Sequence, residues 1–230
     1  MNMSNRTIII LVSCAISINL NAQLTETKKD LYWQPERKIE FSDYQSISND
    51  ECVKYNKMYG VHLQSSIGFR WAVDVPKKWN GKIDKGYIVP VFCKNCSCKL
   101  SEDTLELKTD QLLFDITEIC ARRARIDLDN FQKTGNIDNP NSMFFISMKN
   151  KWEEEKRKFF GAAINEILLE KQDGAYEKWR KTTDELLEET KDFATKPEDC
   201  YRIVLGKPIV KGYKKAKMIT GDLRNNNENR

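Results

Sequence analysis

The spacing of hydrophobic residues along the chain changes near residue 101. Before this point apolar and polar residues alternate, most clearly where Phe69, Trp71 and Val73 fall on one face. Alternation with a period of two is typical of a half-buried β-strand. The first half therefore predicts three strands, at residues 38–41 shortly after Trp33, at 61–73 and at 87–92, with Pro90 indicating an edge or a bulge in the last of them.

From Ser101 onward the hydrophobic residues recur every three or four positions, which is the helical period. A first helix is expected to start at Ser101 or Asp103, whose side chains can cap it, and to end before Gly135. A second helix covers residues 142–171, a third carries Tyr176 to Phe193, and a last strand is predicted at 201–205. The apolar stripe of the first helix consists of Leu105, Leu112, Ile116, Cys120, Ala124, Leu128 and Phe131.

These elements predict an α+β fold in which a small antiparallel sheet from the first half packs against about three helices from the second. The chain has 230 residues, of which 40% are hydrophobic and 31% charged, a balance that supports one domain with a substantial core. We expect that domain to span residues 23–220, and residues 221–230 to form a disordered tail.

The N-terminus has the pattern of a targeting segment. Arg6 precedes an apolar run that extends to about Leu20, and Ala22 offers a cleavage point, so residues 1–22 are interpreted as a signal peptide. The alternative is a lipoprotein, because Leu11-Val12-Ser13-Cys14 has the form of a lipidation motif at Cys14. Both interpretations predict an exported protein, either periplasmic or secreted. No later segment approaches the ~18 apolar residues of a transmembrane helix.

Charge narrows the class of partner. The net charge is +4, or +3 without Arg6, which is too small to indicate binding to nucleic acid or to an anionic membrane. The C-terminal lysines are interpreted as a solvated tail, because a single aromatic residue, Tyr213, lies among them. The expected partner is therefore a protein or peptide ligand of unknown identity. These lysines are Lys207, Lys211, Lys214, Lys215 and Lys217.

Six cysteines remain once Cys14 is removed with the signal peptide, and an even count in an exported chain predicts disulfides. Several pairings are compatible with the sequence. Cys93, Cys96 and Cys98 also have ligand-like spacing, but no second cysteine or histidine pair completes a zinc site. The six candidates for disulfides are Cys52, Cys93, Cys96, Cys98, Cys120 and Cys200.

The most specific motif reads Gln-Leu-Leu-Phe-Asp-Ile-Thr-Glu-Ile-Cys-Ala-Arg-Arg, from Gln111 to Arg123. It resembles the helix of a family of exported bacterial zinc-protease-like proteins, catalogued as domain of unknown function 922. In that family the helix reads approximately His-Glu-Gln-x-His-Phe-Asp-Ile-x-Glu, followed by Ala-Arg. Weaker similarity extends over residues 31–195. The resemblance implies a zincin-like fold, in which two histidines four residues apart bind zinc and the glutamate activates its water.

The three chemical positions of that motif are replaced by Thr109, Asp110 and Leu113. Threonine is a poor zinc ligand at neutral pH, leucine cannot be one, and Asp110 is one methylene shorter than glutamate. The chain has one histidine, His62, expected to be structural or exposed, so a two-histidine site cannot form within it. The resemblance therefore implies an exported, non-catalytic homologue without a zinc cofactor, acting as a binding or structural protein in the periplasm or cell envelope.

Two alternatives stay open. An active hydrolase or peptidase could use Asp110, Asp115 and Glu118 around a hard metal ion. Asp115 and Glu118 share a side of the helix, however, and could equally bind Arg122 or Arg125. The other alternative is a thiol or metal protein built on the three cysteines at positions 93, 96 and 98.

Overall fold

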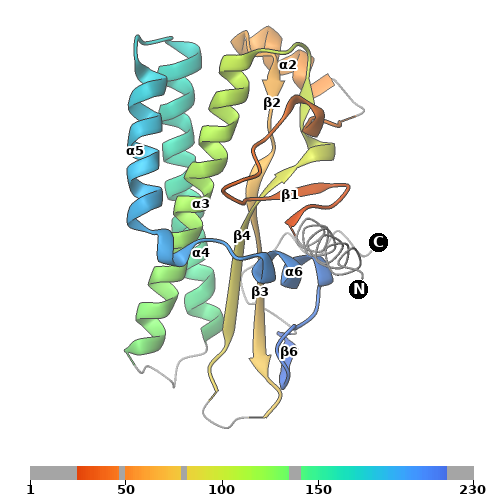
Figure 1. The fold of residues 1–230 in the computed structure, drawn as a ribbon, viewed down its shortest axis with the longest axis vertical. Helices are drawn as coiled ribbons and strands as arrows, with labels where there is room; N and C mark the ends of the chain where they lie inside the picture. The colour runs from red at the N-terminus through yellow and green to blue at the C-terminus, as the bar shows by residue number, and fades with distance from the viewer. Residues whose placement is uncertain (1–24, 47–49, 79–81, 135–140, 217–230) are drawn as a thin grey trace, which may run out of the picture.

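The computed structural model describes residues 25–46, 50–78, 82–134 and 141–216, with the side chains of 141–144 excepted. The predicted signal peptide with Cys14 and the predicted tail at 221–230 lie outside these residues. Figure 1 shows strands on one side of the molecule and long helices on the other. The α+β class predicted from the sequence is therefore confirmed.

The main sheet has four antiparallel strands in the order β1-β4-β3-β6. Its centre is the hairpin of β3 and β4, paired from Ile67 opposite Phe92 to Asp74 opposite Lys85. A separate two-stranded sheet joins β2 to β5. The strands are β1 (Asp30–Tyr32), β2 (Leu63–Gln64), β3 (Ile67–Pro76), β4 (Lys85–Cys93), β5 (Cys98–Lys99) and β6 (Tyr213–Lys215).

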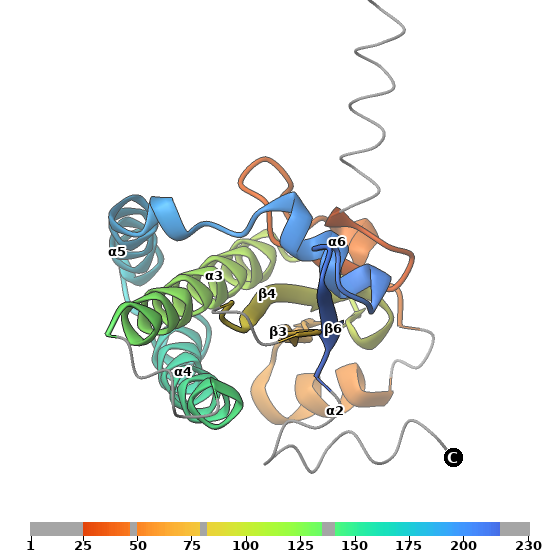
Figure 2. The ribbon, with the colours of Figure 1, turned by 90° about the horizontal axis from the view of Figure 1, so that it is seen from below.

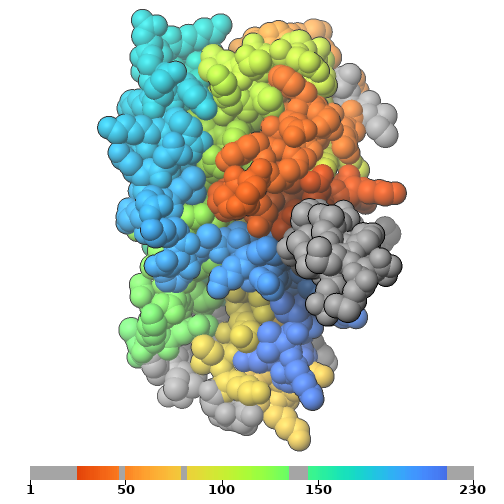
Figure 3. Space-filling view, in the orientation of Figure 1, coloured from red at the N-terminus to blue at the C-terminus, as the bar shows by residue number. Residues whose placement is uncertain are grey.

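Helix α3 lies between the sheet and the two other long helices, as the view from below shows (Figure 2). None of the helices in the described part combines the length and hydrophobicity needed to cross a membrane. Figure 3 shows the first described segment, residues 25–46, in orange, lying beside α3. The α-helices are α2 (Asp50–Tyr59), α3 (Thr104–Lys133), α4 (Asn141–Ile164, extended by a π-helical turn at Asn165–Leu169), α5 (Ala175–Glu189) and α6 (Pro197–Leu205).

Helix α3 begins where the sequence predicts. Asp103 caps it, since one carboxylate oxygen accepts hydrogen bonds from the amides of Leu105 and Glu106 at 2.9 and 3.0 Å. The predicted stripe is buried from Leu112 to Leu128, whereas Leu105 in the first turn is 41% exposed. The period thus identifies the buried side of α3 but extends it one turn too far toward the N-terminus.

Strand β4 is buried on both faces, which explains its nearly continuous apolar sequence. Ile88 and Phe92 lie in the clusters that pack against α3, whereas Val89 and Val91 pack with α6. The expectation that Pro90 marks an edge or a bulge is wrong, because β4 lies between β1 and β3 and its register with β3 is unbroken through Phe69 opposite Pro90. Proline is tolerated there because the pairing with β1 ends one residue away, at Tyr32 opposite Val91.

Three local predictions need correction. The strand expected at 38–41 is absent; the first strand is β1, and residues 38–41 lead into the 3-10 turn Phe41–Asp43. Residues 201–205 form the end of α6 rather than a strand. Pro197 suits the first turn of that helix, and Gly206, with φ of 67°, ends it. The C-terminal lysine segment includes strand β6 rather than being a solvated tail.

Helix α6 is joined to β3 by an ion pair that is shielded from solvent. The guanidinium of Arg202 contacts both carboxylate oxygens of Asp74, with Nε to Oδ2 at 2.7 Å. Arg202 is 1% exposed and Asp74 is fully buried. The guanidinium also lies 5.6 Å from the ring centroid of Tyr87. This bidentate geometry satisfies two charges that would be costly if left alone.

Removing one partner of this ion pair should therefore lower the free energy of unfolding much more than removing an exposed arginine. We expect Arg202→Ala to lower the free energy of unfolding by about 3–5 kcal/mol, because Asp74 keeps a buried, unpaired charge. Arg70→Ala is the matched control, since the half-exposed pair of Arg70 and Asp30 contributes less than about 1 kcal/mol. Urea unfolding of both variants measures the difference, and equal losses would contradict this role for Arg202.

Candidate functional site

The three degenerate motif positions lie in the buried part of α3. Thr109 is fully buried, and its hydroxyl donates to the carbonyl of Leu105, one turn earlier in the same helix, at 2.8 Å. Leu113 is 3% exposed and belongs to a hydrophobic cluster with Ala163 and Ile167 of the following helical segment. The two positions that the resemblance aligns with zinc-binding histidines are therefore packed within the protein.

Asp110 has its own partners from the first half of the chain. The hydroxyls of Tyr44 and Ser65 donate to its two carboxylate oxygens at 2.5 and 2.7 Å. Burial raises the pKa of Asp110 to about 6; the two hydrogen bonds act in the opposite direction, and the nearby charge of Glu106 adds to the rise. Tyr44 and Ser65 cannot be predicted as partners of Asp110 from the sequence, because no spacing rule connects positions so far apart.

A second polar cluster lies one turn earlier on α3. One oxygen of Glu106 accepts hydrogen bonds from the backbone amides of His62 and Leu63 at 2.7 and 2.6 Å. The other lies 3.1 Å from Nδ1 of His62, whose side chain is 40% exposed. These contacts join the start of β2 to the first turn of α3.

The ligand atoms of His62, Asp103 and Glu106 lie within 4.8 Å of one another, which makes them the one group in the described residues with the composition and spacing of a metal site. Both oxygens of Glu106 and one oxygen of Asp103 already accept hydrogen bonds. The positive end of the α3 dipole also disfavours a cation at this position. The cluster is better described as the cap of α3 than as a metal centre.

Asp115 and Glu118 anchor other segments to α3. Asp115 accepts hydrogen bonds from the indole of Trp33 and from Arg180 of α5, both at 2.7 Å, and from Gln111 at 2.9 Å. Glu118, fully buried, binds Arg122 of its own helix at 2.7 Å. Its remaining contacts are the amide and hydroxyl of Thr195 at 2.7 and 2.6 Å and the guanidinium of Arg125 at 3.6 Å.

Four of the six candidate cysteines form disulfides, Cys52 with Cys98 and Cys93 with Cys96. Cys120 and Cys200 are free thiols and fully buried. They lie in different clusters, on either side of the sheet, so they cannot pair with each other. Burial raises the pKa of each thiol to about 12.

The loop that carries the cysteines holds neighbouring segments together. Ser97 donates from its hydroxyl to the carbonyl of Cys93 at 2.7 Å and accepts from the amide of Ser66 at 2.9 Å. The amide of Gln45 donates to the carbonyl of Lys94 at 3.0 Å. The loop thus supports the two segments that supply Tyr44 and Ser65, and its sulfurs are bound in disulfides.

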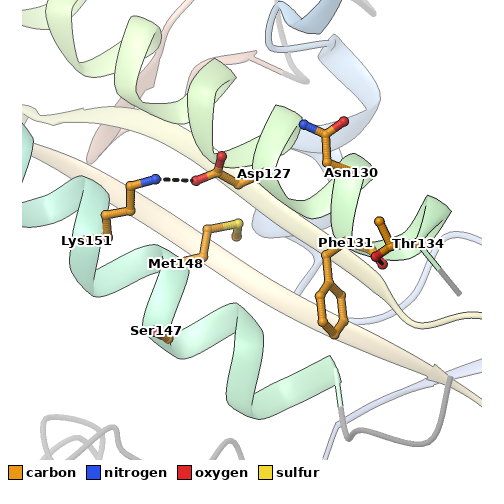
Figure 4. A pocket seen from close by; sticks show the side chains of 7 residues that line it. All are labelled: Asp127, Asn130, Phe131, Thr134, Ser147, Met148 and Lys151. Carbon is orange, nitrogen blue, oxygen red and sulfur yellow. Dashed lines mark hydrogen bonds and ion pairs between the residues drawn. The ribbon is translucent and has the colours of Figure 1, made fainter. Parts of the chain in front are cut away.

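Two hollows in the described surface lie elsewhere. One, of about 410 Å³, opens between α3 and α4, where Lys151 forms an ion pair with Asp127 at 2.9 Å (Figure 4). Another lies against α2, beside Val53 and Met58. Neither is lined by the degenerate motif positions. The lining of the first consists of Asp127, Asn130, Phe131, Thr134, Ser147, Met148 and Lys151.

In comparisons with known proteins, no family model, curated protein or solved structure matches this chain. The similarity to domain of unknown function 922 therefore rests on the motif in α3 and its flanking segments, and it stays a prediction.

The buried Asp110 predicts a pH-dependent stability. Its pKa rises from 3.8 to about 6 on folding, so the folded state prefers the protonated carboxyl, and stability is lost as the pH rises through this interval. Asp110→Asn mimics the protonated form. We expect it to raise the free energy of unfolding by up to about 3 kcal/mol at about pH 7.5, and to leave it nearly unchanged at about pH 4.

Urea unfolding at both pH values provides the measurement. Asp173→Asn, in the exposed turn before α5, is the control and should shift unfolding by less than about 0.5 kcal/mol at either pH. An Asp110→Asn effect of the same size at both pH values would refute the assignment.

The disulfide pattern predicts which thiols react. Without reduction, denatured protein should be alkylated at Cys120 and Cys200, and also at Cys14 where the N-terminal segment is retained. Native protein should be protected at the two buried thiols, because they are inaccessible and their pKa values are raised. Peptide mapping by mass spectrometry, with and without reduction, distinguishes the sites. Alkylation of Cys93, Cys96 or Cys98 before reduction would instead favour a thiol-dependent protein.

Proposed function

We propose that this chain is an exported, non-catalytic homologue of a zinc-dependent protease, acting as a binding or structural protein in the periplasm or cell envelope. One observation carries the proposal: the positions corresponding to the metal ligands and the general base are part of the packed interior. Thr109 is bonded to its own helix, Leu113 lies in a hydrophobic cluster, and Asp110 is held by two hydroxyls.

Zinc-dependent hydrolysis requires features that this region lacks. A catalytic zinc ion needs about three protein ligands and an open position for water, and a base must reach that water. Leu113 provides no ligand atom, and both carboxylate oxygens of Asp110 accept hydrogen bonds, from Tyr44 and Ser65. A zincin-like scaffold that keeps the surrounding motif but fills these positions is consistent with a role in binding or structure.

The alternative hydrolase has weaker support. Its three carboxylates would have to converge on one metal ion or substrate, yet they have separate partners from different segments. Asp115 accepts three hydrogen bonds, one of them from Arg180, and Glu118 is enclosed by arginines and Thr195. These contacts favour anchoring over catalysis. The hypothesis of a thiol or metal protein built on Cys93, Cys96 and Cys98 also has weaker support, because all three sulfurs are in disulfides.

Metal analysis combined with a cleavage assay tests the proposal. The whole chain is expressed and the protein is purified from the cell envelope or medium, where we expect to recover it. It should carry no stoichiometric zinc and should not cleave casein, because the motif lacks ligands. Stoichiometric zinc together with chelator-sensitive cleavage would overturn the proposal.

Two variants assign any activity that is found. Activity or zinc lost in His62→Asn would place a metal site at the cap of α3, and activity lost in Asp110→Asn would support the alternative hydrolase. Activity unchanged in both would indicate a contaminating protease.

A further inference from the structure

Two lysine-rich segments that are far apart in sequence meet at one end of the sheet. Strand β6 pairs with the end of β3, placing Tyr213 opposite Pro76 and Lys215 opposite Asp74. The amide of Lys77 donates to the carbonyl of Gly212 at 2.8 Å, which extends the contact beyond the strands. In Figure 3 the yellow and blue segments lie together at the bottom of the molecule. We call these two paired segments the basic end; their described residues include Lys77, Lys78, Lys82, Lys85, Lys207, Lys211, Lys214 and Lys215.

The basic end concentrates charge that the composition of the chain conceals. Residues 76–86 contain four lysines and one acidic residue, Asp84, and residues 206–216 contain four lysines and no acidic residue. Their net charge is +7, so the rest of the chain, at 4 − 7, is −3. Among the described residues no ion pair involves these eight lysines, and seven of them are exposed. The eighth, Lys85, lies over the ring of Tyr213.

Aliphatic side chains are exposed among the lysines. Ile83 is 43% exposed and Val210 is 36% exposed. Tyr213 holds their backbones in place: its hydroxyl donates to the carbonyl of Ile83 at 3.0 Å, and its amide donates to the carbonyl of Val210 at 3.3 Å. Lysines that surround exposed aliphatic groups are typical of surfaces that settle into the headgroup region of a bilayer.

We propose that the basic end binds the surface of an anionic lipid bilayer. It forms a projecting end of the molecule, and its lysines line neither of the two hollows described above, which fits a flat partner. Binding of single-stranded nucleic acid favours exposed aromatic rings, whereas Tyr213, the aromatic residue among the described residues of the basic end, is 8% exposed and covered by Lys85. Each lysine near an anionic membrane strengthens binding about fivefold.

Vesicle flotation of the full chain tests this proposal. Phosphatidylcholine vesicles, with and without phosphatidylglycerol, are compared, because binding to neutral vesicles reports any contribution of the apolar N-terminal segment. The increment, meaning the additional binding that phosphatidylglycerol causes, should weaken as the salt concentration increases. Lys82→Glu with Lys211→Glu should reduce that increment by more than about 25-fold, the effect of two lysines. Ile83→Ser should leave the salt dependence intact and lower the affinity by a smaller factor.

The control is Lys54→Glu with Lys57→Glu, which changes the net charge equally on the exposed side of α2. It should retain the phosphatidylglycerol-dependent increment within about twofold. Equal losses in the two double variants, or no dependence on phosphatidylglycerol, would overturn the proposal. So would binding to single-stranded DNA that exceeds binding to anionic vesicles and is lost in the Lys82→Glu, Lys211→Glu variant.

Discussion

The structure depends on the cost of burying charge on one helix. Beyond its first turn, helix α3 carries three buried carboxylates, Asp110, Asp115 and Glu118, and an unpaired charge there would cost several kcal/mol. Each carboxylate accepts hydrogen bonds from a different region. Asp110 accepts from two hydroxyls in the first half of the chain, and Asp115 accepts from Trp33 and from Arg180 of α5. Glu118 accepts from Thr195, in the segment that leads to α6. Hydrophobic burial is non-directional, whereas each of these hydrogen bonds requires one position of its segment along the helix. Polar partners thus determine the order in which the layers meet.

The sequence predicts what is local and periodic. The extent of α3, its cap at Asp103 and the buried face of β3 follow from short-range patterns that the fold keeps. The strand predicted at 201–205 fails because a segment of five residues is too short to distinguish the two periods, and the better signals were Pro197 before it and Gly206 after it. The first strand was placed too late, since a three-residue strand such as β1 leaves almost no pattern of its own.

Some features of the candidate site could likewise be predicted from the sequence, and others could not. That Thr109 and Leu113 cannot bind zinc follows from their chemistry, without a structure. The hydrogen bonds of Tyr44 and Ser65 to Asp110 could not be predicted in this way, because they span 66 and 45 residues of sequence. The basic end is missed for a related reason: a net charge averages over the chain, whereas pairing of β3 with β6 gathers lysines from two segments. Properties that depend on which distant segments meet are therefore inaccessible to spacing rules.

The two disulfides are nested, and this has a consequence for the order of folding. Cys52 pairs with Cys98, 46 residues later, across the shorter link between Cys93 and Cys96. In a chain that oxidises as it emerges from its N-terminus, Cys93 becomes available to Cys52 before Cys98 does. Early oxidation therefore favours the non-native pair of Cys52 and Cys93. The correct partner is specified by the pairing of Gln64 with Cys98 in the small sheet. Native oxidation must therefore wait for β2 and β5 to pair, or be repaired by thiol–disulfide exchange, which makes a catalyst of disulfide isomerisation a determinant of yield.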